Sequence, residues 1–160
     1  MNLSAKQAEC LKMMEAASVV YLTNIDKDGF PSTRAMLNLK NPNEYPGLVA
    51  VHEAEENPLT VFMSTNTSSQ KFAEIEQNGK ANLYYCDPQK FYAVLLQGTV
   101  EIITDNELRQ RAWQKDWGEL YYPKGDSDYT LLRFVPATLK IWNSYEEPNI
   151  YKSDAFSLRH

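Results

Sequence analysis

The segment FYAVLLQGTVEII, residues 91–103, is the longest strand signal in the chain. It carries no charge from Phe91 to Val100, and aliphatic and aromatic side chains dominate it. Strands favour these residues, and a long uncharged strand is expected in the middle of a sheet. Because turns separate most of the neighbouring strand signals, the segment indicates an antiparallel barrel and not a doubly wound parallel sheet.

Shorter strand signals lie on both sides of this segment. They cover residues 18–25, 30–39, 59–64, 80–85 and 129–142, and the last is expected to be interrupted near Pro136. The turn Asp26-Lys27-Asp28-Gly29 joins the first two as a hairpin, because Asp-Gly favours the backbone angles of a tight turn. The sequence therefore predicts a mostly β fold, with a six-stranded antiparallel barrel and flanking helices.

Three helices are predicted between the strands, at about residues 4–16, 68–77 and 104–115. The first begins at a capping box, Ser4-Ala5-Lys6-Gln7, and the third begins at another, formed by Thr104 and Glu107. The second is expected to end at Asn78-Gly79 with a left-handed cap.

Length and composition limit the possible functions. The 160 residues suit one domain, assigned to residues 1–145, followed by a C-terminal tail at 146–160. The net charge of −5 argues against binding to nucleic acid. No signal peptide or membrane span is recognised, and Cys10 and Cys86 are too far apart in sequence to suggest a disulfide framework or a metal site. The expected location is the cytoplasm.

Histidine is scarce, since only His52 and His160 are present. The acidic segment around His52, within residues 41–58, is predicted to be an exposed loop. This scarcity argues against Ser-His-Asp hydrolysis, which needs a well-placed general base, and against a metal site.

Residues 62–71, with the sequence FMSTNTSSQK, carry the strongest binding signal. A strand leads into hydroxyl side chains and then into a helix with Lys71 in its first turn. Hydroxyls, free backbone N–H groups and the helix dipole favour an anion such as phosphate at that position. The same pattern also describes an ordinary helix N-cap, and the residues alone leave both interpretations open.

Arg34 gives a second binding signal, because it lies within an otherwise apolar strand. A half-buried guanidinium is costly unless it meets an anion, and its planar fork suits a phosphate. The alternative is an arginine that faces solvent or pairs with a glutamate.

The motifs follow one another in a specific order: PSTRAML at 31–37, STNTSSQK at 64–71, IEQN at 75–78 and LQGTV at 96–100. This succession resembles the FMN-binding split-barrel proteins of the pyridoxamine 5'-phosphate oxidase-like superfamily. Residues 113–134 and 140–142 are similar to its general stress protein branch. The resemblance spans about residues 5–143 and implies a six-stranded antiparallel split β-barrel.

The resemblance also implies which residues bind the cofactor: Arg34, Ala35, Met36, Leu37, Ser64, Thr65, Gln70 and Lys71. Arg34 and Lys71 would bind the FMN phosphate, with Gln70 beside them. The strand backbone from Arg34 to Leu37 would run along the isoalloxazine ring, and the two hydroxyls would bind the flavin or its ribityl chain. FAD stays possible, because it shares the ring and a phosphate.

Relatives of this kind are usually homodimers with each flavin at the subunit interface. Trp142 or Trp113 would then cover the ring from the partner chain, or would instead pack into the core. The remaining partner would be a small-molecule electron donor or acceptor. No side chain is assigned as a catalytic acid or base, because hydride moves to or from the flavin N5.

The chain departs from true pyridoxamine 5'-phosphate oxidases at several points: the substrate cluster expected in residues 105–125 and the basic C-terminal motif have no clear counterpart, and Gln70 replaces a basic residue. Leu39 stands where they have a lysine for the substrate phosphate, and Ala93 stands near a position where they have a flavin-contacting glutamine. The expected function is an FMN-dependent oxidoreductase acting on an unknown small molecule. The alternatives are a non-catalytic flavin-binding or sensing protein, a heme-binding split barrel, and a true pyridoxamine 5'-phosphate oxidase.

Overall fold

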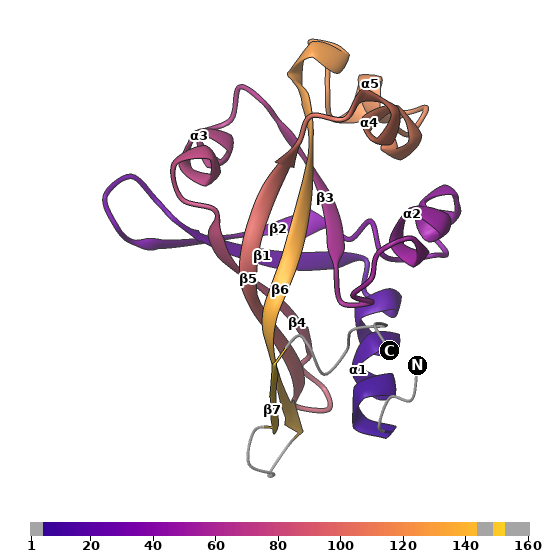
Figure 1. The fold of residues 1–160 in the computed structure, drawn as a ribbon, viewed down its shortest axis with the longest axis vertical. Coiled ribbons are helices and arrows are strands. Elements are labelled where there is room, and N and C mark those ends of the chain that lie inside the picture. The colour runs from indigo at the N-terminus through magenta and orange to yellow at the C-terminus, as the bar shows by residue number, and fades with distance from the viewer. Residues whose placement is uncertain (1–4, 144–148, 153–160) are drawn as a thin grey trace.

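The computed structural model describes residues 5–143 and 149–152, which are organised by one curled antiparallel sheet (Figure 1). Its strands are β1 (Val19–Ile25), β2 (Pro31–Leu37), β3 (Val61–Asn66), β4 (Lys80–Asp87), β5 (Tyr92–Ile103), β6 (Tyr129–Asn143) and β7 (Asn149–Lys152). Six follow the order β2-β1-β4-β5-β6-β3, and β7, from the segment assigned to the tail, pairs with β6 beside this path. The predicted fold, a six-stranded antiparallel split barrel with flanking helices, is confirmed.

The long uncharged segment forms β5, which pairs with β4 on one side and β6 on the other. Contrary to expectation, β6 is not interrupted at Pro136. The register between the two strands shifts between Gln97 and Gly98, so the proline is accommodated by a β-bulge. Glycine is needed at position 98, because a Cβ atom there would lie 2.1 Å from the carbonyl oxygen of Val135.

The predicted helices are present as α1 (Ala5–Ala16), α3 (Gln70–Gln77) and α4 (Asn106–Ala112). Segments for which the sequence predicts no helix contain α2 (Val49–Glu53), α5 (Trp117–Leu120) and short 3₁₀ turns at Pro46–Leu48 and Asp126–Asp128. In Figure 1, α4 and α5 lie together at one end of the sheet and α1 lies toward the other end. No helix within the described ranges has the length and apolar character needed to span a membrane.

The helix ends differ in part from the predictions. The side chain of Asp105, not that of Thr104, caps α4 by accepting a hydrogen bond from the backbone N–H of Leu108. The left-handed cap predicted after α3 is wrong, because Asn78 is extended with φ −146°. Gly79 instead permits a close approach, since a Cβ atom there would lie 2.7 Å from the carbonyl oxygen of Val100. Ser4 of the first capping box lies outside the described residues.

His52 is not in an exposed loop, which corrects the sequence prediction. It lies on α2 with only 8% of its surface exposed. Its Nδ1 lies 3.1 Å from the carbonyl oxygen of Leu48, and its Nε2 accepts a hydrogen bond from the backbone N–H of Phe62 at 3.4 Å. Burial and the nearby Lys40 ammonium lower the pKa of His52 to about 4, although the contact with Leu48 opposes this shift, so the ring is uncharged near neutral pH.

Two hydrophobic clusters hold the sheet in its curled form. The larger one fills the inside of the sheet and includes Leu22, Leu83 and Leu96, covered by α1 through Met14. The second packs α4 and α5 against the β3–β6 end and is rich in aromatic residues. This second cluster fixes the position of the segment that follows α5, which contributes to the site described next.

Candidate functional site

A cleft opens where the two edge strands of the curled sheet, β2 and β3, approach each other beside the start of α3. It has a volume of about 380 Å³ and is here called the β2–β3 cleft. Its lining residues are Val19, Arg34, Ala35, Met36, Leu37, Ser64, Thr65, Asn66, Lys71, Tyr121 and Tyr122. The volume lies within the range of small-molecule sites in proteins.

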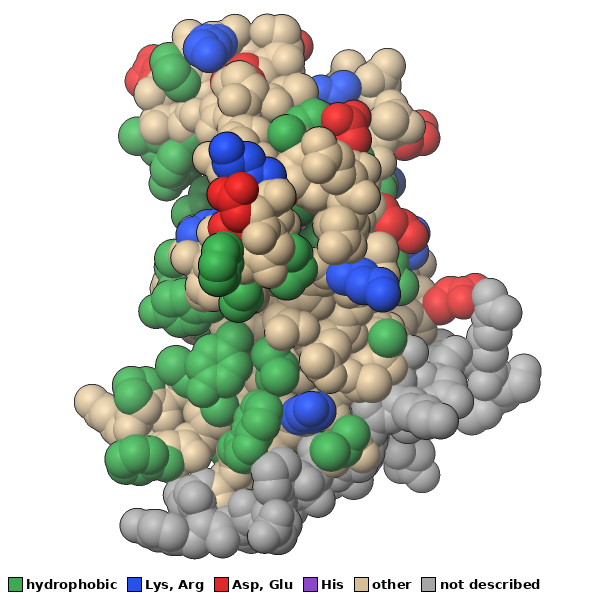
Figure 2. Space-filling model, turned by 90° about the vertical axis from the view of Figure 1, so that its left-hand side faces the viewer, with side chains coloured by type: hydrophobic (Ala, Val, Ile, Leu, Met, Phe, Trp, Pro, Cys, Tyr) green, Lys and Arg blue, Asp and Glu red, His purple; other side chains and the backbone are tan. Residues whose placement is uncertain are grey.

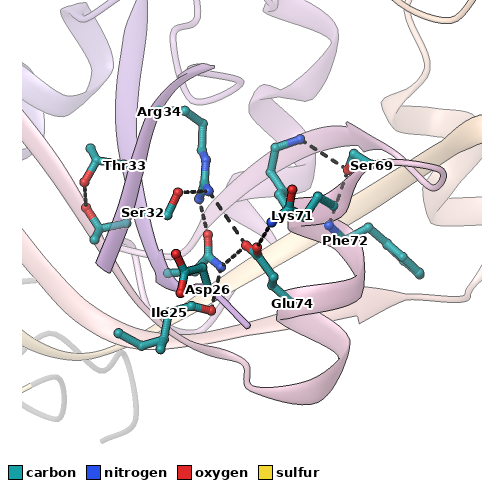
Figure 3. Close-up of polar contacts among 12 residues, drawn as sticks. Ile25, Asp26, Ser32, Thr33, Arg34, Ser69, Lys71, Phe72 and Glu74 are labelled. Carbon is teal, nitrogen blue, oxygen red and sulfur yellow. Dashed lines mark hydrogen bonds and ion pairs between the residues drawn. The ribbon is translucent and has the colours of Figure 1, made fainter. Parts of the chain in front are cut away.

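Arg34 contributes a half-buried guanidinium from β2 (Figure 3). It donates hydrogen bonds to Ser32 Oγ at 2.9 Å and to Asn24 Oδ1, and its Nη2 lies 3.9 Å from Glu74 Oε2. Burial lowers the pKa of Arg34, and the Glu74 carboxylate opposes that shift. The arginine stays charged, because even a lowered guanidinium pKa remains far above neutral pH.

Lys71 contributes the second cation from the first turn of α3. Its Nζ donates hydrogen bonds to Thr65 Oγ1 and to Ser69 Oγ, the latter at 3.5 Å. Burial lowers the pKa of Lys71, the nearby Arg34 guanidinium lowers it further, and Glu74 raises it. Two cations held close together in a half-buried cleft repel each other, so an anion bound between them would stabilise both.

Glu74 is the buried carboxylate that organises this cation pair. The residue is 7% exposed, and its carboxylate accepts hydrogen bonds from Asn24 Nδ2 at 2.9 Å and from Gln70 Nε2 at 2.7 Å. Glu74 does not line the cleft, but its negative charge compensates part of the positive charge of Arg34 and Lys71. The sequence alone offers one clue to this role: Glu74 follows Lys71 by three residues and so lies on the same side of the helix.

Asp128 holds the loop between β3 and α3. Its carboxylate accepts hydrogen bonds from the backbone N–H of Ser68 at 2.8 Å, from Ser68 Oγ at 3.1 Å and from Asn66 Nδ2 at 3.1 Å. These bonds, first of all the one from the Ser68 backbone N–H, and the nearby Lys124 ammonium lower the pKa of Asp128. Sequence reasoning missed this residue, because it lies about sixty positions from the loop that it fixes.

The cofactor residues implied by the resemblance line the β2–β3 cleft, with Gln70 as the exception. Gln70 is exposed, and its amide donates to Glu74 instead of facing the cleft. Trp113 packs against Trp117 and Tyr129 in the second hydrophobic cluster. This is the second of the two predicted placements, in which the tryptophan packs into the core and does not cover a flavin ring. Trp142 lines a different cleft beside Tyr84. The aromatic walls that this chain brings to the β2–β3 cleft are Tyr121 and Tyr122, which the sequence prediction did not include.

An exposed apolar face adjoins the cleft. Tyr21 of β1 lies directly opposite Tyr84 of β4, and both are more than one-third exposed. Val19, 40% exposed, belongs to the same strand and lines the cleft itself. Figure 2 shows hydrophobic side chains gathered on the lower part of one side of the molecule. The cleft is therefore bordered by a surface suited to contact with another apolar surface.

Comparison with protein families gives one match, to the model described as pyridoxamine 5'-phosphate oxidase, over residues 7–143. No curated protein matches the chain.

Solved structures give several matches over most of the chain. One is a Clostridium acetobutylicum protein related to general stress protein 26 of B. subtilis, with 25% identity, TM-score 0.75 and coverage of 96% of this chain and 99% of that one. A pyridoxamine 5'-phosphate oxidase-related, FMN-binding protein from Nostoc punctiforme has 17% identity, TM-score 0.62 and coverage of 94% and 91%. A heme-binding protein from Mycobacterium smegmatis has 14% identity, TM-score 0.69 and coverage of 98% and 61%.

Proposed function

The chain belongs to the pyridoxamine 5'-phosphate oxidase family, and from this premise we propose that it is an FMN-binding flavoprotein of the general stress protein type. In this proposal it transfers electrons between the flavin and a small molecule. One observation carries the proposal: Arg34 and Lys71 come from different elements and converge in a cleft with hydroxyls and a helix N-terminus.

The residues of the cleft fit each part of FMN. Arg34 and Lys71 would hold the phosphate, which carries about two negative charges near neutral pH. Ser64 and Thr65 would offer hydroxyls to the ribityl chain or ring. The β2 backbone and the apolar side chains of Met36 and Leu37 would form a wall for the flat isoalloxazine. Bound FMN supplies reversible redox chemistry that no side chain of the protein can supply.

The chain's own contribution would be to bind the cofactor, orient it and exclude water. Among the described residues that line the cleft there is no carboxylate, histidine or cysteine. Proton transfer by a side chain of the lining is therefore not part of the proposal. Tyr122 is buried, and burial raises its pKa to about 12, so its hydroxyl would act as a neutral hydrogen-bonding group.

The proposal includes a homodimer. The apolar face around Tyr21 and Tyr84 continues into the cleft at Val19, so a second copy seated on that face would also cover part of the cleft. Trp142, which borders this face beside Tyr84, would then lie at the interface rather than in solvent.

The test compares FMN binding by the full chain and by two matched double variants. Arg34→Ala/Lys71→Ala removes the cation pair, and Lys27→Ala/Lys80→Ala removes the same charge from exposed positions outside the cleft. We expect the first to weaken FMN binding at least about hundredfold and the second to leave it nearly unchanged. Retention of the flavin absorbance near ~450 nm after dialysis gives the readout, and circular dichroism checks the fold.

Failure of the wild-type chain to retain FMN would contradict the proposal, as would equal binding by both double variants. Bleaching of the bound flavin by NADPH without oxygen would separate an oxidoreductase from a flavin-binding protein that does no chemistry. FMN and FAD would be distinguished by competition at the same site.

Two other functions receive less support from the structure. Heme needs an axial ligand; the one histidine among the described residues is His52, and both of its ring nitrogens are already engaged by Leu48 and Phe62. A true pyridoxamine 5'-phosphate oxidase needs a substrate-phosphate cation at the end of β2. Leu39 is buried in the second hydrophobic cluster there, and the next residue, Lys40, lines a separate cavity.

A further inference from the structure

A second cavity lies on the side of the molecule formed by α1, α2 and the connection from α2 to β3. It has a volume of about 420 Å³ and is here called the Lys40 cavity. Its apolar walls come from Leu11, Pro42, Val49 and Pro58, and its polar lining comes from Lys40, His52, Glu15, Glu53 and Glu55. The exposed Pro42 and Glu53 lie at its rim, so small molecules can enter from solvent. None of these residues lines the β2–β3 cleft.

Lys40 supplies the amine of this cavity. It is 8% exposed, and its Nζ donates one hydrogen bond, to the carbonyl oxygen of Thr60 at 3.2 Å. Within residues 5–143 and 149–152, no carboxylate lies within ion-pair distance of this Nζ. Two of the three N–H donors of the ammonium therefore have no protein partner there, which is costly for a buried charge.

Burial favours the neutral form of Lys40, whereas the nearby carboxylates favour the charged form. Burial lowers the pKa of Lys40 to about 8, and the carboxylates of Glu15 on α1 and Glu55 after α2 oppose this shift from a distance. Glu55 is engaged by Arg133, which donates to its Oε2 from Nε at 3.0 Å. His52 on α2 is neutral near pH 7, because burial and the Lys40 charge lower its pKa to about 4. Glu53 lies exposed at the rim.

We propose that the Lys40 cavity is a second site, which binds small uncharged aldehydes and joins them to Lys40 Nζ as an imine. Apolar walls suit an uncharged ligand, while the carboxylates of Glu15, Glu53 and Glu55 disfavour an anion. A lysine amine desolvated in an apolar pocket is the form that attacks carbonyl carbon. The inference is independent of FMN binding, since the two sites share no lining residue.

The reaction balances without an oxidant or reductant. The lone pair of the neutral amine forms the C–N bond, and the carbonyl electrons move to the oxygen. The oxygen then leaves as water, carrying away the two protons that the nitrogen loses. The product is an imine between Nζ and the aldehyde carbon, and water reverses the reaction.

The experiment traps this imine on the full wild-type chain. A short pulse of propanal with sodium cyanoborohydride at pH 7 converts the imine into a stable propyl-lysine, and peptide mass spectrometry locates it. The exposed Lys27 and Lys80 are internal references in the same sample. We expect Lys40 to be labelled about tenfold faster than either reference, because a larger fraction of its amine is neutral at this pH. Its labelling rate should level off above about pH 8.

Two further measurements separate a site from an incidental reactive amine. A polymeric aldehyde such as oxidised dextran should lose the preference for Lys40, because it is far larger than the cavity of about 420 Å³ while the exposed lysines stay accessible to it. Lys40→Arg should abolish labelling of that peptide, and Lys27→Arg should leave labelling of Lys40 unchanged. Labelling of Lys40 at or below the rate of the references would overturn the proposal, and so would equal reaction with the polymeric aldehyde.

Discussion

Lys71 and Lys40 are both withdrawn from water, but their surroundings differ in kind. In the β2–β3 cleft, Lys71 meets hydroxyls from Thr65 and Ser69 and lies near a second cation, Arg34. In the Lys40 cavity, the amine meets one carbonyl oxygen, apolar walls and carboxylates that are too far away to pair with it.

The difference shows how one residue type can serve two chemistries in a single small domain. In the β2–β3 cleft, two clustered cations and nearby hydroxyls favour the binding of an anion. Lys71 is therefore suited to hold a phosphate through a permanent positive charge. Desolvation without a close counterion favours loss of the proton, so Lys40 is suited to act as a neutral amine. The following changes test this contrast, from the largest expected effect to the smallest.

The largest effect concerns His52, which contacts both the Lys40 cavity and the sheet. Its pKa falls from 6.5 in the unfolded chain to about 4 in the folded one. The unfolded state therefore binds the proton first, and the contribution present above pH 6.5 is lost as the pH falls toward 4. We expect a loss of about 3 kcal/mol in the free energy of unfolding across this window. Urea denaturation at several pH values measures it, and His52→Gln should lose most of that slope. An unchanged slope in the variant would mean that other groups cause the acid lability.

The next effect separates the two lysines directly. Lys71→Met should weaken FMN binding about hundredfold, because it removes a charge-assisted contact to the phosphate. It should change riboflavin binding little, since riboflavin has no phosphate. Lys40→Met is the matched control and should leave both affinities unchanged. Isothermal titration measures all four values, and equal losses for FMN and riboflavin would place Lys71 on the ring rather than on the phosphate.

At pH 7, a smaller effect on stability is expected from substitution of Lys40. Its folded pKa of about 8 lies below the unfolded value of 10.5, so wild-type stability should rise as the pH increases from 8 to 10.5. Lys40→Met should lack this rise and should be more stable than wild type by about 1 kcal/mol at pH 7, because a buried charge is replaced by an apolar chain. Thermal unfolding across this pH range is the check. A parallel pH dependence in both proteins would show that Lys40 stays charged.

The smallest effect concerns the charge that Glu74 places next to the cation pair Arg34 and Lys71. Glu74→Gln keeps a hydrogen-bonding side chain next to Asn24 and Gln70 but removes the negative charge near Arg34. FMN binding should tighten roughly fivefold at low salt, and the gain should shrink at high salt. Riboflavin is again the control. Weaker FMN binding in this variant would indicate that Glu74 acts mainly by positioning Arg34.

Sequence reasoning captured what local patterns encode. The composition and length of the strand segments and the turns between them predicted β1 to β6, and the hydroxyls before Lys71 predicted the N-terminus of α3. It failed where tertiary contacts override local signals. The acidic segment around His52 became a helix, because Leu48 and Val51 are buried in the second hydrophobic cluster.

The candidate site shows the same division. Arg34, Thr65 and Lys71 were recognisable, because a charged or hydroxyl side chain in an unusual local setting is visible in the sequence. Gln70 was predicted to lie beside Arg34 and Lys71, and in the structure it is exposed and its amide donates to Glu74. Tyr121, Tyr122 and Asp128 were missed, because only the folded chain brings that late segment beside β3.

The bonds from Asp128 to the loop after β3 also have a consequence for synthesis on the ribosome. The β1–β2 hairpin, which carries Arg34, is local and can form as soon as it emerges. The opposite wall cannot, because β3 pairs with Tyr129–Phe134 of β6 and its loop waits for Asp128. The nascent chain would thus carry only one wall of the candidate site until β6 emerges, and competence to bind a ligand there would come only then.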